Sequence, residues 1–259
     1  MAGIHNSRPT AAAALLAAIF SGPAYAGSQY VIVSVEPAAE NYAPGLVLDL
    51  NDSIHVPSGT VVTLLGEDGS VNAIPGPADI TVTEDAVETA GSGERDAQQR
   101  KRSTIAKLAD LLAGEQKSAD SLGVARGLGS RPKPRGLDDP WVVSVHQDGA
   151  GCIRAGQIRL GRKTDTETIS VSVGSDRGGT PQILTWRQGE ADLQLPEGFG
   201  AEQGALTVQA GSNHVVIQLK PLPQSVNPQN PIDVLGWMIS ESCDGQALAF
   251  TRQLVIEAQ

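Results

Sequence analysis

Glycine and proline interrupt this chain so often that long regular elements have little room. The sequence has 29 glycines and 16 prolines in 259 residues, and the runs between them are short and rich in valine, isoleucine and leucine. Glycine and proline favour turns, whereas β-branched residues favour strands. Aromatic residues make up only 3% of the chain, so the core must be aliphatic. The pattern predicts many short strands and a mainly β fold.

Residues 1–26 have the layout of a cleavable secretory signal. Arg8 precedes an apolar run over 11–20, and the small-x-small triplet Ala24-Tyr25-Ala26 follows two helix breakers. An apolar run of about ten residues is half of the roughly 20 that span a membrane. We expect cleavage after Ala26 and export of a chain without a membrane span, to the periplasm or the medium.

The two cysteines, Cys152 and Cys243, are an even pair in a chain expected to be exported. In an oxidising compartment such a pair usually forms a disulfide. Closing a loop of about 90 residues stabilises a fold by up to roughly 4 kcal/mol in the chain-entropy model. Two alternatives are a pair of buried thiols that never meet and a Cys152 nucleophile beside His146. No histidine lies within a few residues of either cysteine, so a metal site is not expected.

Charge divides the chain into three segments. Residues 27–94 hold 11 acidic residues and no lysine or arginine, residues 95–135 have a net charge of +6, and residues 136–259 have a net charge of −6. Such segregation is typical of separately folded units joined by a connector. We therefore predict one unit over 27–83, a connector over 84–136 and a second unit over 137–259.

The first unit reads as a small antiparallel β-roll. Asp68-Gly69 is a hairpin signal between two apolar runs, and other turn residues separate the remaining runs. The predicted strands cover 30–35, 46–50, 53–56, 60–65, 71–74 and 80–82.

The connector is polar and basic and contains one predicted amphipathic helix, at about 104–113. Its apolar face consists of Ile105, Leu108, Ala109, Leu111 and Leu112, with Ser103 or Thr104 as the expected start. The basic cluster before the helix is Arg100, Lys101 and Arg102. Three interpretations are open: the cluster lies against its acidic neighbour, lies exposed in a linker, or contacts a polyanionic surface or an envelope protein. Nucleic acid is not expected as a partner of an exported acidic chain.

The second unit reads as a β-sandwich followed by two short helices, which makes the whole chain α+β but mainly β. Two of its strands, 168–173 and 214–219, alternate apolar and polar residues as half-buried strands do. The other predicted strands cover 139–146, 158–160, 182–186, 192–195 and 205–209. Helical spacing then places Ile232, Leu235, Ile239 and Cys243 on one face, and Ala247, Leu248, Phe250 and Leu254 suggest the second helix.

Part of the first unit resembles the FecR-type periplasmic module, over about residues 44–82. The resemblance rests on the apolar opening at 44–48, the glycine-punctuated strands at 53–65, the Asp-Gly hairpin at 68–71 and the Pro-Gly-Pro at 75–77. It implies an all-β module that contacts a protein or an envelope component, without catalysis. No transmembrane helix or cytoplasmic sigma-regulator segment precedes the module here, so the iron-signalling role of the family is not transferred.

No set of residues in the sequence converges on a catalytic motif. His55, His146 and His214 lie in or at the end of apolar strands, where packed or surface rings are expected, and no G-x-S-x-G is present. Acidic neighbours such as Asp138-Asp139 are expected to serve solubility, with weak calcium binding as an alternative. We predict no cofactor, no metal and a non-enzymatic exported binding or scaffold protein. The alternatives are an envelope hydrolase that uses Asp138, Asp139 and Glu190, and an accessory subunit or sensor that modulates a membrane protein.

Overall fold

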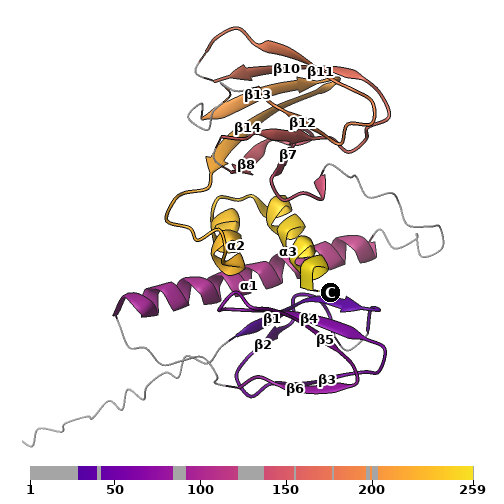
Figure 1. Ribbon diagram of the computed structural model, residues 1–259, viewed down its shortest axis with the longest axis vertical. Coiled ribbons are helices and arrows are strands. Elements are labelled where there is room, and N and C mark those ends of the chain that lie inside the picture. The colour runs from indigo at the N-terminus through magenta and orange to yellow at the C-terminus, as the bar shows by residue number, and fades with distance from the viewer. Residues whose placement is uncertain are drawn as a thin grey trace, which may run out of the picture.

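The computed structural model describes residues 29–39, 42–83, 92–121, 137–154, 156–176, 178–196, 199 and 204–258. Within this part of the chain the protein is mainly β, with three helices, which confirms the predicted fold class (Figure 1). The predicted signal and its cleavage point lie outside the described residues. None of the helices in the described part is long and apolar enough to cross a membrane.

The N-terminal strands form two small antiparallel sheets. One has the order β2-β1-β4-β5 and the other pairs β3 with β6. A hairpin at Asp68-Gly69 joins β4 to β5, as predicted. The strands are β1 (Tyr30–Glu36), β2 (Val47–Leu48), β3 (Ser53–Val56), β4 (Val61–Gly66), β5 (Val71–Pro75) and β6 (Ala78–Thr81).

Two further sheets form a sandwich at the opposite end of the molecule (Figure 1). The larger sheet has the order β11-β10-β13-β14-β8, with β8 parallel to β14, and the smaller sheet has the order β12-β9-β7. The sequence analysis missed β8, which is glycine-rich and lacks β-branched residues apart from its last position. The strands are β7 (Val142–Ser144), β8 (Gly149–Ile153), β9 (Arg159–Gly161), β10 (Ile169–Ser175), β11 (Gln182–Trp186), β12 (Asp192–Gln194), β13 (Ala205–Ala210) and β14 (Asn213–Pro221).

Three helices lie between the sandwich and the N-terminal sheets (Figure 1). They are α1 (Ser92–Ser121), α2 (Pro231–Ser240) and α3 (Asp244–Ala258). The predicted helix at 104–113 was too short, because α1 extends about three turns further toward the N-terminus and two toward the C-terminus. Ser103 and Thr104 are interior residues of α1 rather than its cap. Both hydroxyls donate to the carbonyl of Arg100, which lets the helix continue through them.

The apolar face predicted for α1 is correct and forms the centre of a shared core. Ile105 and Leu108 are fully buried, and they pack in one cluster with side chains from β1, β4, α2 and α3. Strand β1 contributes to two cores, because Val31 and Val33 face the helices while Ile32 faces β3 and β6. The C-terminal helices therefore complete a core that begins near the N-terminus.

Two glycines permit the closest approaches of α1 to its neighbours. A Cβ atom on Gly45 would lie 2.7 Å from the carbonyl oxygen of Ala109, and the residue has φ +94°. A Cβ atom on Gly236 of α2 would lie 2.8 Å from the hydroxyl of Thr104. Larger residues at these positions would push α1 away from the N-terminal sheet or from α2.

Candidate functional site

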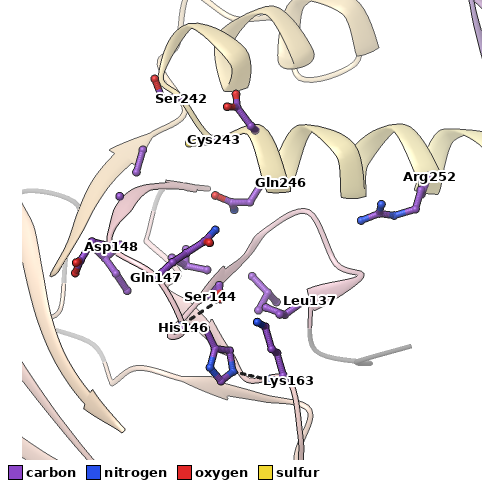
Figure 2. A pocket seen from close by; sticks show the side chains of 17 residues that line it. Leu137, Ser144, His146, Gln147, Asp148, Lys163, Ser242, Cys243, Gln246 and Arg252 are labelled. Atoms are coloured by element: carbon purple, nitrogen blue, oxygen red, sulfur yellow. Dashed lines mark hydrogen bonds between the residues drawn. The ribbon is translucent and has the colours of Figure 1, made fainter. Parts of the chain in front are cut away.

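A cleft of about 350 Å³ lies at the joint between the sandwich and α3. One wall comes from β7, the segment after it and β8, and the other wall comes from the start of α3 (Figure 2). Pockets at the boundary between structural layers are common positions for ligand sites. This cleft is therefore the candidate site.

A disulfide joins Cys243, which lines the cleft, to Cys152. The Cα atoms are 6.0 Å apart, and both side chains are buried, at 0% and 3% exposure. The bond confirms the predicted pairing. It joins β8 of the sandwich to the turn between α2 and α3, whereas the spacing had placed Cys243 on the first C-terminal helix. Because both thiols are consumed, the alternative of a Cys152 nucleophile is not supported.

Gln246 makes a second connection across the same joint. Its Oε1 accepts from the N–H of Cys152, and its Nε2 donates to the carbonyls of Cys152 and Pro140, each at 2.8 Å. The side chain is buried, and all three bonds go to main-chain groups: two to Cys152 of β8 and one to Pro140, which precedes β7. This role of Gln246 was not predicted, because a glutamine in a polar helical turn does not indicate which distant main-chain groups it will bond to.

His146 lies in the cleft, and its ring is hydrogen-bonded to Lys163, which also lines the cleft (Figure 2). Its Nε2 accepts from the main-chain N–H of Lys163 at 2.7 Å, so Nδ1 carries the proton of the neutral ring and faces the side-chain amide of Asn213, 3.1 Å away. A nitrogen that accepts from a main-chain N–H carries no proton, so this ring is neutral. Burial and the charge of Lys163 lower the pKa of His146, which agrees with the neutral form. Because its unprotonated nitrogen, Nε2, already accepts from the Lys163 N–H, His146 is not placed as a general base.

The cleft presents charges of both signs. Lys163 and Arg252 reach into it from the segment after β9 and from α3, and the acidic lining residues are Asp148 and Asp244 (Figure 2). Arg252 also bonds to Glu115 of α1 at 2.8 Å, and Asp148 accepts from the N–H of Val216. Within the described residues, no group of three or more His, Cys, Asp or Glu side chains could hold a metal ion. The lining therefore offers charged groups of both signs to a ligand.

The other histidines considered in the sequence lie apart from this cleft. His55 is exposed on β3, where its Nδ1 is 2.6 Å from a carboxylate oxygen of Asp79 on β6. His214 is exposed on β14, next to Asn213. The structure does not bring the three histidines into one site.

The carboxylates of the hydrolase alternative have structural partners. Asp139 accepts from the main-chain N–H of Trp141 at 2.9 Å and from Arg159 at 2.5 Å, while Arg159 also bonds to Asp192. The hydrogen bond to Asp192 contributes most to raising the pKa of Arg159, and the bond to Asp139 raises it further. Glu190 accepts from the main-chain N–H of Arg187. Asp138 is exposed.

The predicted basic cluster lies in the first half of α1. Arg100 is exposed and Lys101 is half-buried. The Nε of Arg102 is 3.1 Å from Oε1 of Glu67, a side chain at the end of β4 that is 6% exposed. For Arg102 the structure therefore provides an acidic neighbour within the chain. Contact of Arg100 and Lys101 with a polyanion stays a prediction.

Comparison with protein-family models, with curated proteins and with solved structures finds no match to this chain. The resemblance to the FecR-type module stays a prediction from the residues.

Proposed function

We propose that this chain is an exported, non-enzymatic binding or scaffold protein of the bacterial envelope, with the cleft at the sandwich–α3 joint as its ligand site. The observation that carries the proposal is the buried disulfide between Cys152 and Cys243. A disulfide at the centre of a fold is typical of proteins that mature outside the cytosol. The signal-like residues 1–26 support the same conclusion from an independent part of the sequence.

Binding is favoured over catalysis by the chemistry of the cleft. The sulfur atoms are bonded to each other, Nε2 of His146 accepts from a main-chain N–H, and Asp148 accepts from a main-chain N–H of β14. Lys163 offers a cationic group beside apolar lining residues such as Leu137. This combination fits a small polar ligand with an anionic group, or an acidic side chain of a partner protein. No comparable observation favours hydrolysis by Asp139 and Glu190.

The FecR-like module and the basic part of α1 would provide protein or envelope contacts in the same proposal. Such contacts would also suit the alternative hypothesis, in which the chain is an accessory subunit of a membrane protein. The accessory-subunit hypothesis predicts that a stoichiometric membrane partner is recovered with the chain, and the scaffold hypothesis does not require one.

Export is tested by expressing the full chain in a bacterium with a periplasm and analysing the cell fractions. We expect a periplasmic or secreted product that begins at Gly27 and whose two cysteines resist alkylation until the protein is reduced. An intact product in the cytosol with both thiols free would overturn the proposal.

The cleft is tested by photo-crosslinking in the envelope, with the crosslinker placed at Lys163. Lys107, an exposed lysine on α1, is the matched control position. We expect one defined adduct from position 163 and none of the same mass from position 107. Identical adducts at both positions, or none at position 163, would argue against a binding role for the cleft.

A further inference from the structure

The two edges of the five-stranded sheet differ in how their main-chain groups are used. At the β8 edge, Gln246 bonds to the N–H and the carbonyl of Cys152 and so caps the edge at that residue. The opposite edge is β11, which lies at the end of the sandwich farthest from the helices (Figure 1). Among the described residues, no side-chain hydrogen bond caps a main-chain group of 182–185. Strand β11 therefore presents a row of open donors and acceptors.

Strand β11 also lacks the features with which proteins usually protect an edge. Its sequence, Gln-Ile-Leu-Thr-Trp, contains no charged residue and no proline. Its register with β10 is continuous from Gln182 to Trp186, without a bulge. Charges, prolines and bulges are the common means of preventing edge-to-edge pairing. The regular, uncharged edge is therefore suited to accept another strand.

The side chains at this margin are apolar and incompletely covered. Ile183 is 77% exposed, the highest value among the large apolar side chains that the structure describes as exposed. The apolar residues that only partly enter the sandwich core are Ile169, Leu184 and Leu193. They belong to β10, to β11 and to β12, an edge strand of the smaller sheet. A strand added to the sheet beyond β11 would cover this apolar margin.

The strand is held firmly in place, so its exposure does not come from fraying. Trp186, its last residue, is fully buried and donates its indole N–H to the carbonyl of Glu190. The guanidinium of Arg162 lies 4.9 Å from the centre of the Trp186 ring and donates to the carbonyl of Arg187. An edge that is ordered before binding loses little conformational entropy when it pairs.

We propose that β11 pairs antiparallel with β11 of a second copy of this chain, which joins the two five-stranded sheets into one. A strand that meets its own copy in this way forms a closed, two-fold symmetric contact. If the pairing is centred on Leu184, Ile183 lies opposite Thr185 of the second copy and the two Leu184 side chains meet. Arg187, the first charge beyond the strand, then lies opposite Pro181, so no like charges face each other.

The size of the contact sets its strength. A stable protein interface buries about 1,200–2,000 Å², and one five-residue strand pair covers less than that. The dimer is therefore weak and depends on concentration. Each copy carries a net charge of −10, so long-range repulsion opposes association and salt should strengthen it.

Sedimentation velocity of the purified, oxidised chain over a hundredfold concentration range tests the proposal. We expect a monomer–dimer equilibrium that shifts toward dimer as sodium chloride rises from 50 to 300 mM. Ile183→Lys should weaken association at least tenfold. Val216→Lys is the matched control, because Val216 is also an exposed apolar residue, 38% exposed, but lies on β14 inside the sheet. This control should associate like the wild type.

Hydrogen exchange of the wild type gives a second readout that does not depend on a variant folding. Amides of 182–186 should become more protected as the dimer forms, while other exposed amides do not change. A wild type that stays monomeric, or a dimer that persists in Ile183→Lys, would overturn the proposal. Protection of 182–186 by an added envelope protein but never by a second copy would overturn it as well.

Discussion

Replacement of Gln246 tests whether the joint between the sandwich and α3 depends on one buried amide. Gln246→Met keeps the length of the side chain but removes its donors and its acceptor. The substitution leaves the N–H of Cys152 and the carbonyls of Cys152 and Pro140 without their partner in a buried position. Buried main-chain groups without partners are costly, so the folded state loses stability.

The magnitude follows from the number of bonds. Three hydrogen bonds at about 1–1.5 kcal/mol each predict a loss of about 3–4.5 kcal/mol in the free energy of unfolding. Gln246→Glu retains the acceptor for the Cys152 N–H but turns a carboxylate oxygen toward the two carbonyls. Burial beside carbonyl oxygens raises the pKa of such a glutamate, so the folded variant binds a proton more readily than its unfolded chain. The stability deficit of Gln246→Glu should therefore shrink as pH falls from 7 toward 5.

Urea unfolding followed by tryptophan fluorescence, with the disulfide intact, measures both effects. Gln253→Met on the exposed face of the same helix is the control, and its stability should change by less than about 0.5 kcal/mol. If the free energy of unfolding of Gln246→Met lies within about 1 kcal/mol of the wild-type value, the three bonds do not hold the joint, contrary to the prediction.

Three further predictions concern the same fold. Gly45→Ala should lower the free energy of unfolding by about 2 kcal/mol or more, because the added Cβ atom would clash with the Ala109 carbonyl and the residue has φ +94°. Gly59→Ala is the control in the same urea titration, because Gly59 has φ +79° and an added Cβ would have nothing within 4 Å; its free energy of unfolding should fall clearly less. Because the folded pKa of His146 is below 6.5, the stability contributed by this group is complete above pH 6.5 and is lost as pH falls below that value. In a plot of unfolding free energy against pH, His146→Gln should therefore flatten the part below pH 6.5. Replacing both cysteines by alanine should cost about 4 kcal/mol by the chain-entropy model, measured by denaturation under non-reducing conditions, and an unchanged midpoint would contradict it.

Local sequence patterns predicted the strands well because their signals are local. Turn residues mark the ends of most strands, and Asp68-Gly69 placed the β4–β5 hairpin correctly. The helical face of Ile105 and Leu108 was also visible, because burial imposes a spacing of three and four residues. The cysteine pairing could be predicted from number and expected compartment alone.

The errors concern contacts between distant segments. The first turns of α1 lack apolar periodicity, so they read as linker, although the helix carries Arg102 to the buried Glu67. Strand β8 has almost no strand-like residues, and it is held by pairing with β14 and by Gln246, a residue 94 positions from Cys152. Such partners are chosen by the tertiary fold, and no window of sequence contains both.

The candidate cleft follows from this long-range arrangement and not from a motif. Three connections join the sandwich to the C-terminal helices on one side of the cleft: the disulfide, the Gln246 bonds and the ion pair of Lys220 with Glu241 at 2.9 Å. The Lys163 wall is held separately, through His146. Because independent contacts fix each wall, the cleft is formed before any ligand arrives, which favours recognition by a rigid site over closure around a ligand.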